Sequence, residues 1–325
     1  MSQFWQGKKV LVTGGAGFIG SFVTEQLLAA GATVTITTMP GERKHNIAHL
    51  VSKIGIIEAD LTDAGQAQTA LKDQEVVFHL AAFKKNMAFH KTHPADLLRI
   101  NTQLTLNIFE AAHLEGVKRL LLMSSAVVYS PDAHMPNTED EGFVGEPEGA
   151  HFGYAWSKRI SEVIARGYRD QYGMEIAIAR PDNIYGPRDI FDKESAQVVP
   201  AFINRVVAHE DPFLIWGDGE QERSFLYVED LARGLIELTE HYANGEPVNI
   251  GTDETIKLKD LAHLLMKLEG TSVDLKFDTT KPNGAPMRKR SNKKSAETIH
   301  FKPEYSLEQG LQKTLAWYKN QQKNT

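Results

Sequence analysis

A cluster of glycines directly after a short apolar run is the feature that most constrains this chain. The run Val10–Thr13 is typical of a buried strand, and Phe18–Ala30 has the spacing of an amphipathic helix. The glycines between them lie in a strand-to-helix turn, where the backbone can approach a pyrophosphate and the helix N-terminus offers unpaired N–H groups. We therefore predict a dinucleotide-binding turn that includes Gly14, Gly17 and Gly20. The alternative is a tight turn that only packs the helix on the sheet.

The composition excludes several classes of function. The chain has 325 residues, enough for one large domain or two modest ones, and no cysteine, which excludes disulfides, thiolate zinc sites and cysteine nucleophiles. Its net charge of −6 gives no reason to expect nucleic acid or an anionic membrane as partner. No apolar stretch approaches the ~20 residues of a membrane span, so we expect a cytoplasmic protein. His79, His90 and His93 lack metal-ligand spacing, and we expect no metal site.

Strand-like and helix-like patterns alternate along the first half of the chain. The strand-like runs are largely apolar, and amphipathic stretches such as Ala95–Glu115 and Phe152–Tyr172 lie between them. This alternation is typical of an α/β protein with a Rossmann fold, a doubly wound parallel sheet with helices on both faces. The strand-like runs are Val10–Thr13, Thr33–Thr37, Gly55–Ala59, Val76–Leu80, Arg119–Ser124 and Glu175–Ala179.

The pattern becomes less regular after Arg180. Prolines and the turn at Trp216–Gly219 predict a smaller, irregular α/β domain that carries the substrate pocket. Phe225–Tyr242 has a helical pattern, and Pro247–Gly251 has the pattern of a strand that returns to the main sheet. We therefore expect a cofactor domain of residues 1–180 with a return at about 225–256, and a substrate domain of residues 181–224 and 257–325.

Tyr154 and Lys158 are four residues apart, which places both side chains on one face of the predicted helix. A nearby ammonium favours the phenolate, so we expect Lys158 to lower the pKa of Tyr154 from about 10 toward neutral pH. A tyrosine tuned in this way suits acid–base catalysis on an alcohol or a ketone. Ser125 follows a strand at the carboxyl edge of the sheet, where its hydroxyl can bind the same substrate oxygen as Tyr154.

Ordered motifs extend this pattern along nearly the whole chain, at Thr13–Gly20, Asp60–Asp63, His79–Ala82, Asn101, Ser124–Tyr129, Tyr154–Lys158, Arg180–Pro187 and Arg223–Asp230. Together they resemble the extended short-chain dehydrogenases/reductases, specifically the NAD(P)-dependent nucleotide-sugar epimerase/dehydratase family. The resemblance implies a Rossmann fold, a nicotinamide cofactor and a nucleoside diphosphate sugar as substrate. By the same analogy, Leu97–Ala112 and the helix that bears Tyr154 would pair with their copies in a homodimer.

The resemblance also assigns roles to individual residues. The catalytic trio would be Ser125, Tyr154 and Lys158. The implied cofactor residues are Gly14, Gly17, Phe18, Ile19, Gly20, Thr38, Arg43, Asp60, Leu61, Ala81, Ala82, Asn101, Tyr154, Lys158, Pro181 and Ile184. The implied substrate residues are Ser125, Ala126, Asn183, Trp216, Arg223 and Arg288. Trp216 would lie against the base or ribose and Arg288 at the diphosphate, although the basic run around Arg288 is equally consistent with a solvated surface.

Departures from the family pattern narrow the chemistry. Segments such as Phe191–Pro200 and Lys281–Arg288 resemble the GDP-L-fucose synthases most closely, which epimerise C3 and C5 with a cysteine and a histidine. The matching positions hold Val127 and Gln197, and neither side chain carries a proton near neutral pH. The acidic pair of the 4,6-dehydratases is replaced by Ala126 and Val127. We therefore expect neither 3,5-epimerisation nor dehydration, and hydride transfer at sugar C4 remains.

The end of the second predicted strand bears on cofactor choice. NAD-preferring members of the family place an acidic residue there to bind the ribose 2′-hydroxyl, and the matching residue is Thr38. Arg43 and Lys44 follow in the same loop. The missing carboxylate and the nearby guanidinium suit a 2′-phosphate, so NADP(H) is favoured over NAD(H). The alternative is that both cations are solvated loop charges.

Three hypotheses about function follow. The first is an NADP-dependent reductase of a 4-keto nucleotide sugar, in which Ser125 and Tyr154 polarise the carbonyl and Lys158 holds the cofactor ribose. The second is a nucleotide-sugar 4-epimerase with tightly bound NAD, which uses the same trio twice. The third is a non-catalytic protein that binds the cofactor or the sugar nucleotide, and the intact trio argues against it.

Overall fold

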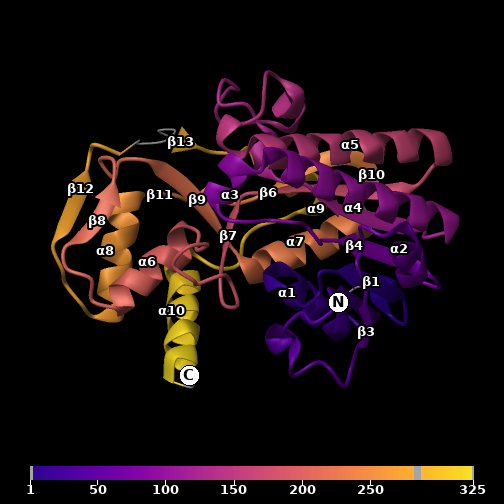
Figure 1. Cartoon of the computed structure of the whole chain (residues 1–325), viewed down its shortest axis with the longest axis horizontal. Coiled ribbons are helices and arrows are strands. Elements are labelled where there is room, and N and C mark those ends of the chain that lie inside the picture. Colours follow the sequence, from indigo (N-terminus) through magenta and orange to yellow (C-terminus); the bar gives the residue numbers. More distant parts are fainter. Residues whose placement is uncertain (1–2, 282–286, 324–325) are drawn as a thin grey trace.

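A seven-stranded, wholly parallel sheet forms the centre of the computed structural model, which describes residues 3–281 and 287–323 (Figure 1). The strand order is β10-β6-β5-β4-β1-β2-β3, so the direction of winding reverses between β1 and β4. Ligands of such sheets bind outside the carboxyl ends of the strands at this switch point. The strands are β1 Lys9–Thr13, β2 Thr33–Thr38, β3 Gly55–Glu58, β4 Val76–His79, β5 Arg119–Met123, β6 Glu175–Pro181 and β10 Asn244–Ile250.

Helices cover both faces of this sheet, which explains why its strands are apolar on both sides. One face carries α1 and α7, which pack together, and the other carries α2, α4 and α5. Val10 and Val12 of β1 join the core on the α1 face, whereas Leu11 joins the core on the α4 face. The helices are α1 Phe18–Ala29, α2 Ala64–Leu71, α3 Met87–Thr92, α4 Pro94–Leu114, α5 Phe152–Tyr172 and α7 Val228–His241.

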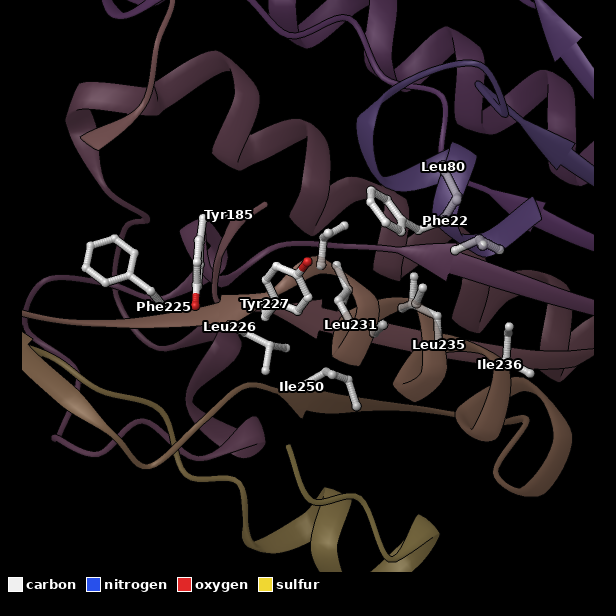
Figure 2. Packing of buried hydrophobic residues seen from close by; sticks show 14 of the residues in the cluster. Phe22, Leu80, Tyr185, Phe225, Leu226, Tyr227, Leu231, Leu235, Ile236 and Ile250 are labelled. Atoms are coloured by element: carbon white, nitrogen blue, oxygen red, sulfur yellow. The ribbon is translucent and has the colours of Figure 1, made fainter. Parts of the chain in front are cut away.

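Apolar side chains of α7 fill the space between the main sheet and its neighbours on one face. Figure 2 shows Leu231, Leu235 and Ile236 pointing from α7 into the same core as Phe22 of α1 and Ile250 of β10. Helix α7 therefore covers part of the main sheet on the same face as α1.

The chain after β6 builds smaller sheets. β9 lies at the centre of one, with β11 and β13 beside its first half and β7 beside its second half, and β8 pairs with β12 in another. Figure 1 shows β8, β12, α6 and α8 gathered at the end of the molecule away from α1 and α4. The remaining elements are β7 Asn183–Tyr185, α6 Val198–Val207, β8 Phe213–Trp216, β9 Glu222–Tyr227, β11 Thr255–Lys257, α8 Leu258–Glu269, β12 Leu275–Asp278, β13 Met287–Arg288, α9 Lys293–Ile299 and α10 Leu307–Lys323.

The predicted fold class is confirmed, including the strand near Pro247–Gly251 that returns to the main sheet beside β6. The helix predicted over Phe225–Tyr242 is wrong at its start. Phe225, Leu226 and Tyr227 are strand residues that pair with β7, and the helix begins at Val228. Acidic residues then occupy the first turn of α7, where they complement the helix dipole. No helix within residues 3–281 and 287–323 has the length and apolar character needed to cross a bilayer.

Leu235→Ala should destabilise the fold, because Leu235 of α7 is 0% exposed. We expect the free energy of unfolding to fall by about 2–5 kcal/mol through lost burial and a residual cavity. Leu114→Ala is the matched control, since Leu114 is 57% exposed and its truncation should change the free energy of unfolding by no more than about 0.5 kcal/mol. Urea unfolding followed by circular dichroism measures both. Equal losses in the two variants would contradict the role of α7 in the core.

Candidate active site

The glycine turn leaves the N-terminus of α1 open at the carboxyl edge of the sheet. Gly14 has φ +66°, a left-handed conformation that favours glycine, and Gly17 is the N-cap of α1. A Cβ at Gly20 would collide with the carbonyl oxygen of Gly14, so the turn and the helix approach closely only because glycine is present. The first-turn N–H groups, which include those of Phe18 and Ile19, find no partner inside the helix. This cradle fits the pyrophosphate of a dinucleotide.

Hydrogen bonds fix the ends of β1 and β4 together beside this turn. The Thr13 hydroxyl accepts from the backbone N–H groups of Leu80 and Ala81 at 3.1 and 3.0 Å. Ala81 also lies against Gly14, where an added Cβ would meet its Cα at 3.2 Å. The predicted cofactor residues of the glycine turn and of the β4 end therefore share one edge, at the switch point of the sheet.

Two of the three predicted catalytic residues lie together on α5. Tyr154 and Lys158 are buried, and Lys158 Nζ lies 5.5 Å from the centroid of the Tyr154 ring. Lys158 Nζ donates to the carbonyl of Met123 at 2.8 Å, which ties α5 to the end of β5. Ser125 lies two residues farther along, half-buried, and caps the short helical turn Ala126–Val128 that packs against α5. The three side chains thus come from the end of β5 and the first turns of α5.

The predicted lowering of the Tyr154 pKa by Lys158 is wrong. Burial raises the pKa of Tyr154 to about 12, because a phenolate loses its hydration there. Burial likewise lowers the pKa of Lys158 to about 8, with a further contribution from the charge of Lys84. The Lys158 ammonium donates to Met123 rather than to the phenol, so no hydrogen bond from it stabilises a phenolate.

The other predicted cofactor residues occupy differing environments. Asp60 follows β3 and accepts from the N–H and hydroxyl of Thr62 at 2.9 and 2.7 Å, which shapes the turn that also contains the buried Leu61. The Asn101 amide is occupied by backbone groups, since it accepts from the N–H of Phe83 and donates to its carbonyl, both at 2.9 Å. Ala82, Pro181 and Ile184 lie at the ends of β4 and β6 and in β7.

The structure distinguishes the residues at and after the end of β2 that were predicted to bind the cofactor ribose. Thr38 is only 2% exposed, and its hydroxyl finds no hydrogen-bond partner within the described part of the chain. Lys44 forms an ion pair with Glu58 at 2.7 Å, which leaves Arg43 as the exposed loop cation without an ion pair among the described residues. The guanidinium of Arg43 is therefore the better candidate for contact with an anion.

The predicted substrate residues lie mainly around β9. The Asn183 amide donates to the carbonyl of Ser224 at 3.0 Å, and Arg223 pairs in backbone register with Arg288 of β13. The side chain of Arg288 lies outside the described part of the structure. Trp216 ends β8 in the separate two-stranded sheet, where its ring is 64% exposed and suits stacking on a base. Ala126 is buried in the turn after Ser125.

Lys84 and Asp189 are candidate site residues that sequence reasoning missed, since Lys84 acts electrostatically on Lys158 and on Asp189. Lys84 follows the end of β4, is solvent-accessible, and lies close enough to Lys158 for its charge to lower the pKa of that lysine. Burial raises the pKa of Asp189 to about 6, and its Oδ2 has no hydrogen-bond partner within residues 3–281 and 287–323. The position of Lys84 in the sequence could have indicated its place near the site, because Lys84 follows the carboxyl end of a parallel strand at the switch point of the sheet. The described residues contain no group of three or more side chains suited to metal binding.

Comparisons with known proteins bear on the family and the fold of the chain. Residues 10–251 match the NAD dependent epimerase/dehydratase family. The chain is 33% identical over 321 residues to a dTDP-4-dehydro-6-deoxy-D-allose reductase from a Streptomyces species, with 97% of each chain covered. It is 32% identical to a GDP-L-fucose synthase from Sinorhizobium fredii, with 95% of this chain and 94% of that protein covered. The solved UDP-glucose 4-epimerase of Thermotoga maritima superimposes with a TM-score of 0.87 at 28% identity, covering 97% of this chain and 99% of that one.

The phenol of Tyr154 should stay protonated in the ligand-free protein up to strongly alkaline pH, because its pKa is raised to about 12 by burial. Absorbance of tyrosinate at ~295 nm, measured during titration of wild type and Tyr154→Phe, isolates this residue. We expect the two curves to coincide up to about pH 10. An extra tyrosinate in wild type near neutral pH would instead support the lowered pKa expected from the sequence.

Proposed function

We propose that this chain, which belongs to the NAD dependent epimerase/dehydratase family, reduces the C4 carbonyl of a 4-keto nucleotide sugar with NADPH. The observation that carries the proposal is that Tyr154 and Lys158 lie together on α5, that Lys158 is bound to the end of β5 just before Ser125, and that the family positions for further proton carriers hold none. Those positions hold Val127, beside the buried Ala126, and the exposed Gln197 at the N-cap of α6. Hydride transfer with one proton transfer is the chemistry that remains.

The residues would divide the work as follows. A bound nicotinamide supplies the hydride. The hydroxyls of Ser125 and Tyr154 bind the C4 carbonyl oxygen and polarise it. Tyr154 then donates its proton from Oη to the oxygen, and the Lys158 ammonium stabilises the phenolate that remains while it holds the cofactor ribose. A buried tyrosine that favours its neutral form carries this proton before substrate arrives, which suits the direction of reduction.

We propose that the cofactor lies along the carboxyl edge of the main sheet. The backbone of Gly14, Gly17 and Gly20 would hold its pyrophosphate, and the turn at Asp60 and Leu61 its adenine. Lys84 would add a cation beside the nicotinamide half, and Asn101 would act through the Phe83 backbone that it holds. Residues 1–180 and about 225–256 would bind the cofactor, and residues 181–224 and 257–325 the nucleotide sugar.

We also propose that two copies associate through α4 and α5. These helices pack against one another and expose apolar side chains, among which Leu106 and Val163 are 41% and 54% exposed. A two-fold contact would bury the exposed apolar side chains of both helices in a four-helix interface. We expect such a homodimer to act in the cytoplasm.

A nucleotide-sugar 4-epimerase is the second candidate, because the backbone superimposes well on a UDP-glucose 4-epimerase. The two candidates differ in the fate of the cofactor. A reductase consumes one nicotinamide per product, whereas a 4-epimerase returns its hydride to the same sugar and leaves the total unchanged. Counting NADPH oxidised per product formed therefore separates them.

Wild-type enzyme should oxidise NADPH in a one-to-one ratio with product when given a nucleoside diphosphate 4-dehydro-6-deoxyhexose. Tyr154→Phe should lower turnover by roughly 10²–10⁴-fold, because it removes the proton donor and keeps the ring. Product is followed by chromatography and NADPH by absorbance. Interconversion of UDP-glucose and UDP-galactose without net change in nicotinamide would instead favour the epimerase.

Arg43→Ala should weaken the use of NADPH selectively, since its guanidinium would bind the 2′-phosphate with paired donors. We expect kcat/KM for NADPH to fall by about 10- to 100-fold while that for NADH changes little. Lys53→Ala, which removes an exposed cation farther along the chain, is the control. An unchanged ratio of the two kcat/KM values would rule out Arg43 as the phosphate ligand.

A further inference from the structure

One buried carboxylate lies where the elements that carry the candidate trio meet. Glu162 of α5 is 5% exposed and stands one turn beyond Lys158, and two beyond Tyr154, on the same helix face. Its Oε1 accepts from the hydroxyl of Ser124 at 2.5 Å. Ser124 lies between Met123, whose carbonyl binds Lys158, and Ser125. Glu162 therefore fixes the end of β5, which leads into Ser125, against α5 one turn away from Lys158.

The other side of this carboxylate is held by β6. Arg180 donates to Glu162 through Nε at 2.9 Å and through Nη2 at 2.6 Å, an arrangement that sets both distance and orientation. Arg180 is itself held in place, since its Nη1 donates to the Tyr129 hydroxyl and to the carbonyl of Glu139 at 3.1 and 2.7 Å. The Tyr129 hydroxyl donates in turn to Asn249 of β10 at 2.6 Å. A rotation or slide of α5 would break this network.

Glu162 also affects the charge of Lys158. The titratable groups that face this lysine are Tyr154 and Glu162 on α5, His79 at the end of β4, and Lys84 after it. Burial lowers the pKa of His79 to about 3, so it is neutral. Burial and Lys84 lower the pKa of Lys158, and Glu162 raises it. Without that carboxylate, the charge of Lys84 would act on Lys158 with no carboxylate among these groups to oppose it.

We propose that Glu162 is a positioning residue that holds the end of β5 against α5 and supplies the negative charge that balances the Lys158 ammonium. This inference rests on the proposed reductase function, in which Lys158 must stay protonated next to Tyr154. The role is more than structural, because the same carboxylate holds the end of β5 against α5 and favours the charged form of Lys158.

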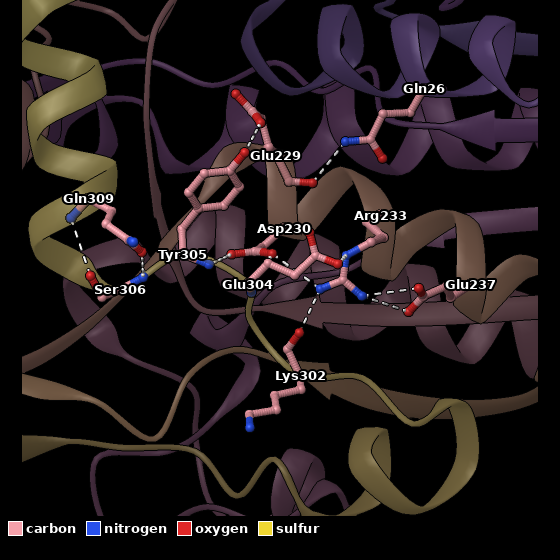
Figure 3. Close-up of polar contacts among 10 residues, drawn as sticks. All are labelled: Gln26, Glu229, Asp230, Arg233, Glu237, Lys302, Glu304, Tyr305, Ser306 and Gln309. Atoms are coloured by element: carbon pink, nitrogen blue, oxygen red, sulfur yellow. Dashed lines mark hydrogen bonds and ion pairs between the residues drawn. The ribbon is translucent and has the colours of Figure 1, made fainter. Parts of the chain in front are cut away.

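The test compares Glu162→Gln, which removes the charge and keeps the shape, with Asp230→Asn. Figure 3 shows that Asp230 accepts from Arg233 and from the backbone of Tyr305. Asp230 is thus a buried, arginine-bound carboxylate, and it lies on α7, which covers the opposite face of the main sheet from α5. Titration of 13Cε-labelled lysines by NMR, with Lys158→Met as the assignment, should give a midpoint near 8 for Lys158 in wild type. We expect Glu162→Gln to lower it by about one pH unit or more, and Asp230→Asn to leave it unchanged.

Kinetics then measure the consequence. Glu162→Gln should lower kcat by about 10- to 100-fold through misplacement of the trio, and should move the alkaline loss of activity to lower pH. Glu162→Asp, which keeps the charge, should return the pH at which activity is lost on the alkaline side toward its wild-type value. Ser124→Ala removes only the hydrogen bond between the end of β5 and Glu162. It should therefore lower kcat without changing the pH at which activity is lost on the alkaline side. It also tests the positioning role if Glu162→Gln does not fold.

The outcomes separate this inference from the proposed function. An unchanged Lys158 midpoint and an unchanged pH profile in Glu162→Gln, with only a lower melting temperature, would overturn the positioning role. A lowered midpoint in a protein that reduces no 4-keto nucleotide sugar would uphold the charge balance and refute the reductase instead, since the NMR titration needs no substrate.

Discussion

The common direction of all seven strands in the main sheet is the constraint on which the candidate site depends. Parallel strands place their carboxyl ends at one edge, and the reversal between β1 and β4 opens that edge to a ligand. The glycine turn after β1, Lys84 after β4 and Ser125 after β5 are thereby brought to one place from distant parts of the chain. Helix α5 completes the site because Lys158 reaches back to the Met123 carbonyl of β5.

Burial is the second constraint, and it acts against charge throughout this site. It favours the neutral forms of Tyr154, Asp189 and His79, and it lowers the pKa of Lys158. Fixed partners offset this cost locally. Glu162 is the clearest example, because Arg180 and Ser124 saturate its carboxylate while its charge supports Lys158. The protonation states of these side chains therefore depend on how deeply the junction of the sheet and α5 buries them and on which partners it provides. The residue types alone do not determine them.

Much of the fold was predictable from the sequence because strands buried on both faces are apolar throughout and helices beside them are amphipathic. Periodicity failed at Phe225–Tyr227, where an apolar run fits both a strand and the first turn of a helix, and pairing with β7 decides between them. The pKa of Tyr154 was predicted with the wrong sign because spacing reveals a neighbouring lysine but not the depth of burial. Lys84 was missed because its sequence position in a loop does not reveal that it lies close to Lys158; only the folded structure does.

The electrostatics of the candidate site also bear on the proposed proton transfer. A 4-epimerase begins by removing a proton from the sugar hydroxyl, which requires Tyr154 as phenolate at the start of the cycle. A reductase begins by giving a proton to the oxygen, which requires the phenol. Burial favours the phenol, and the Lys158 ammonium is bound to the Met123 carbonyl beside the ring, where it can stabilise the phenolate once the proton has left. A tyrosine that holds its proton, with the Lys158 ammonium close to its ring, is the arrangement that proton donation in the proposed reductase requires.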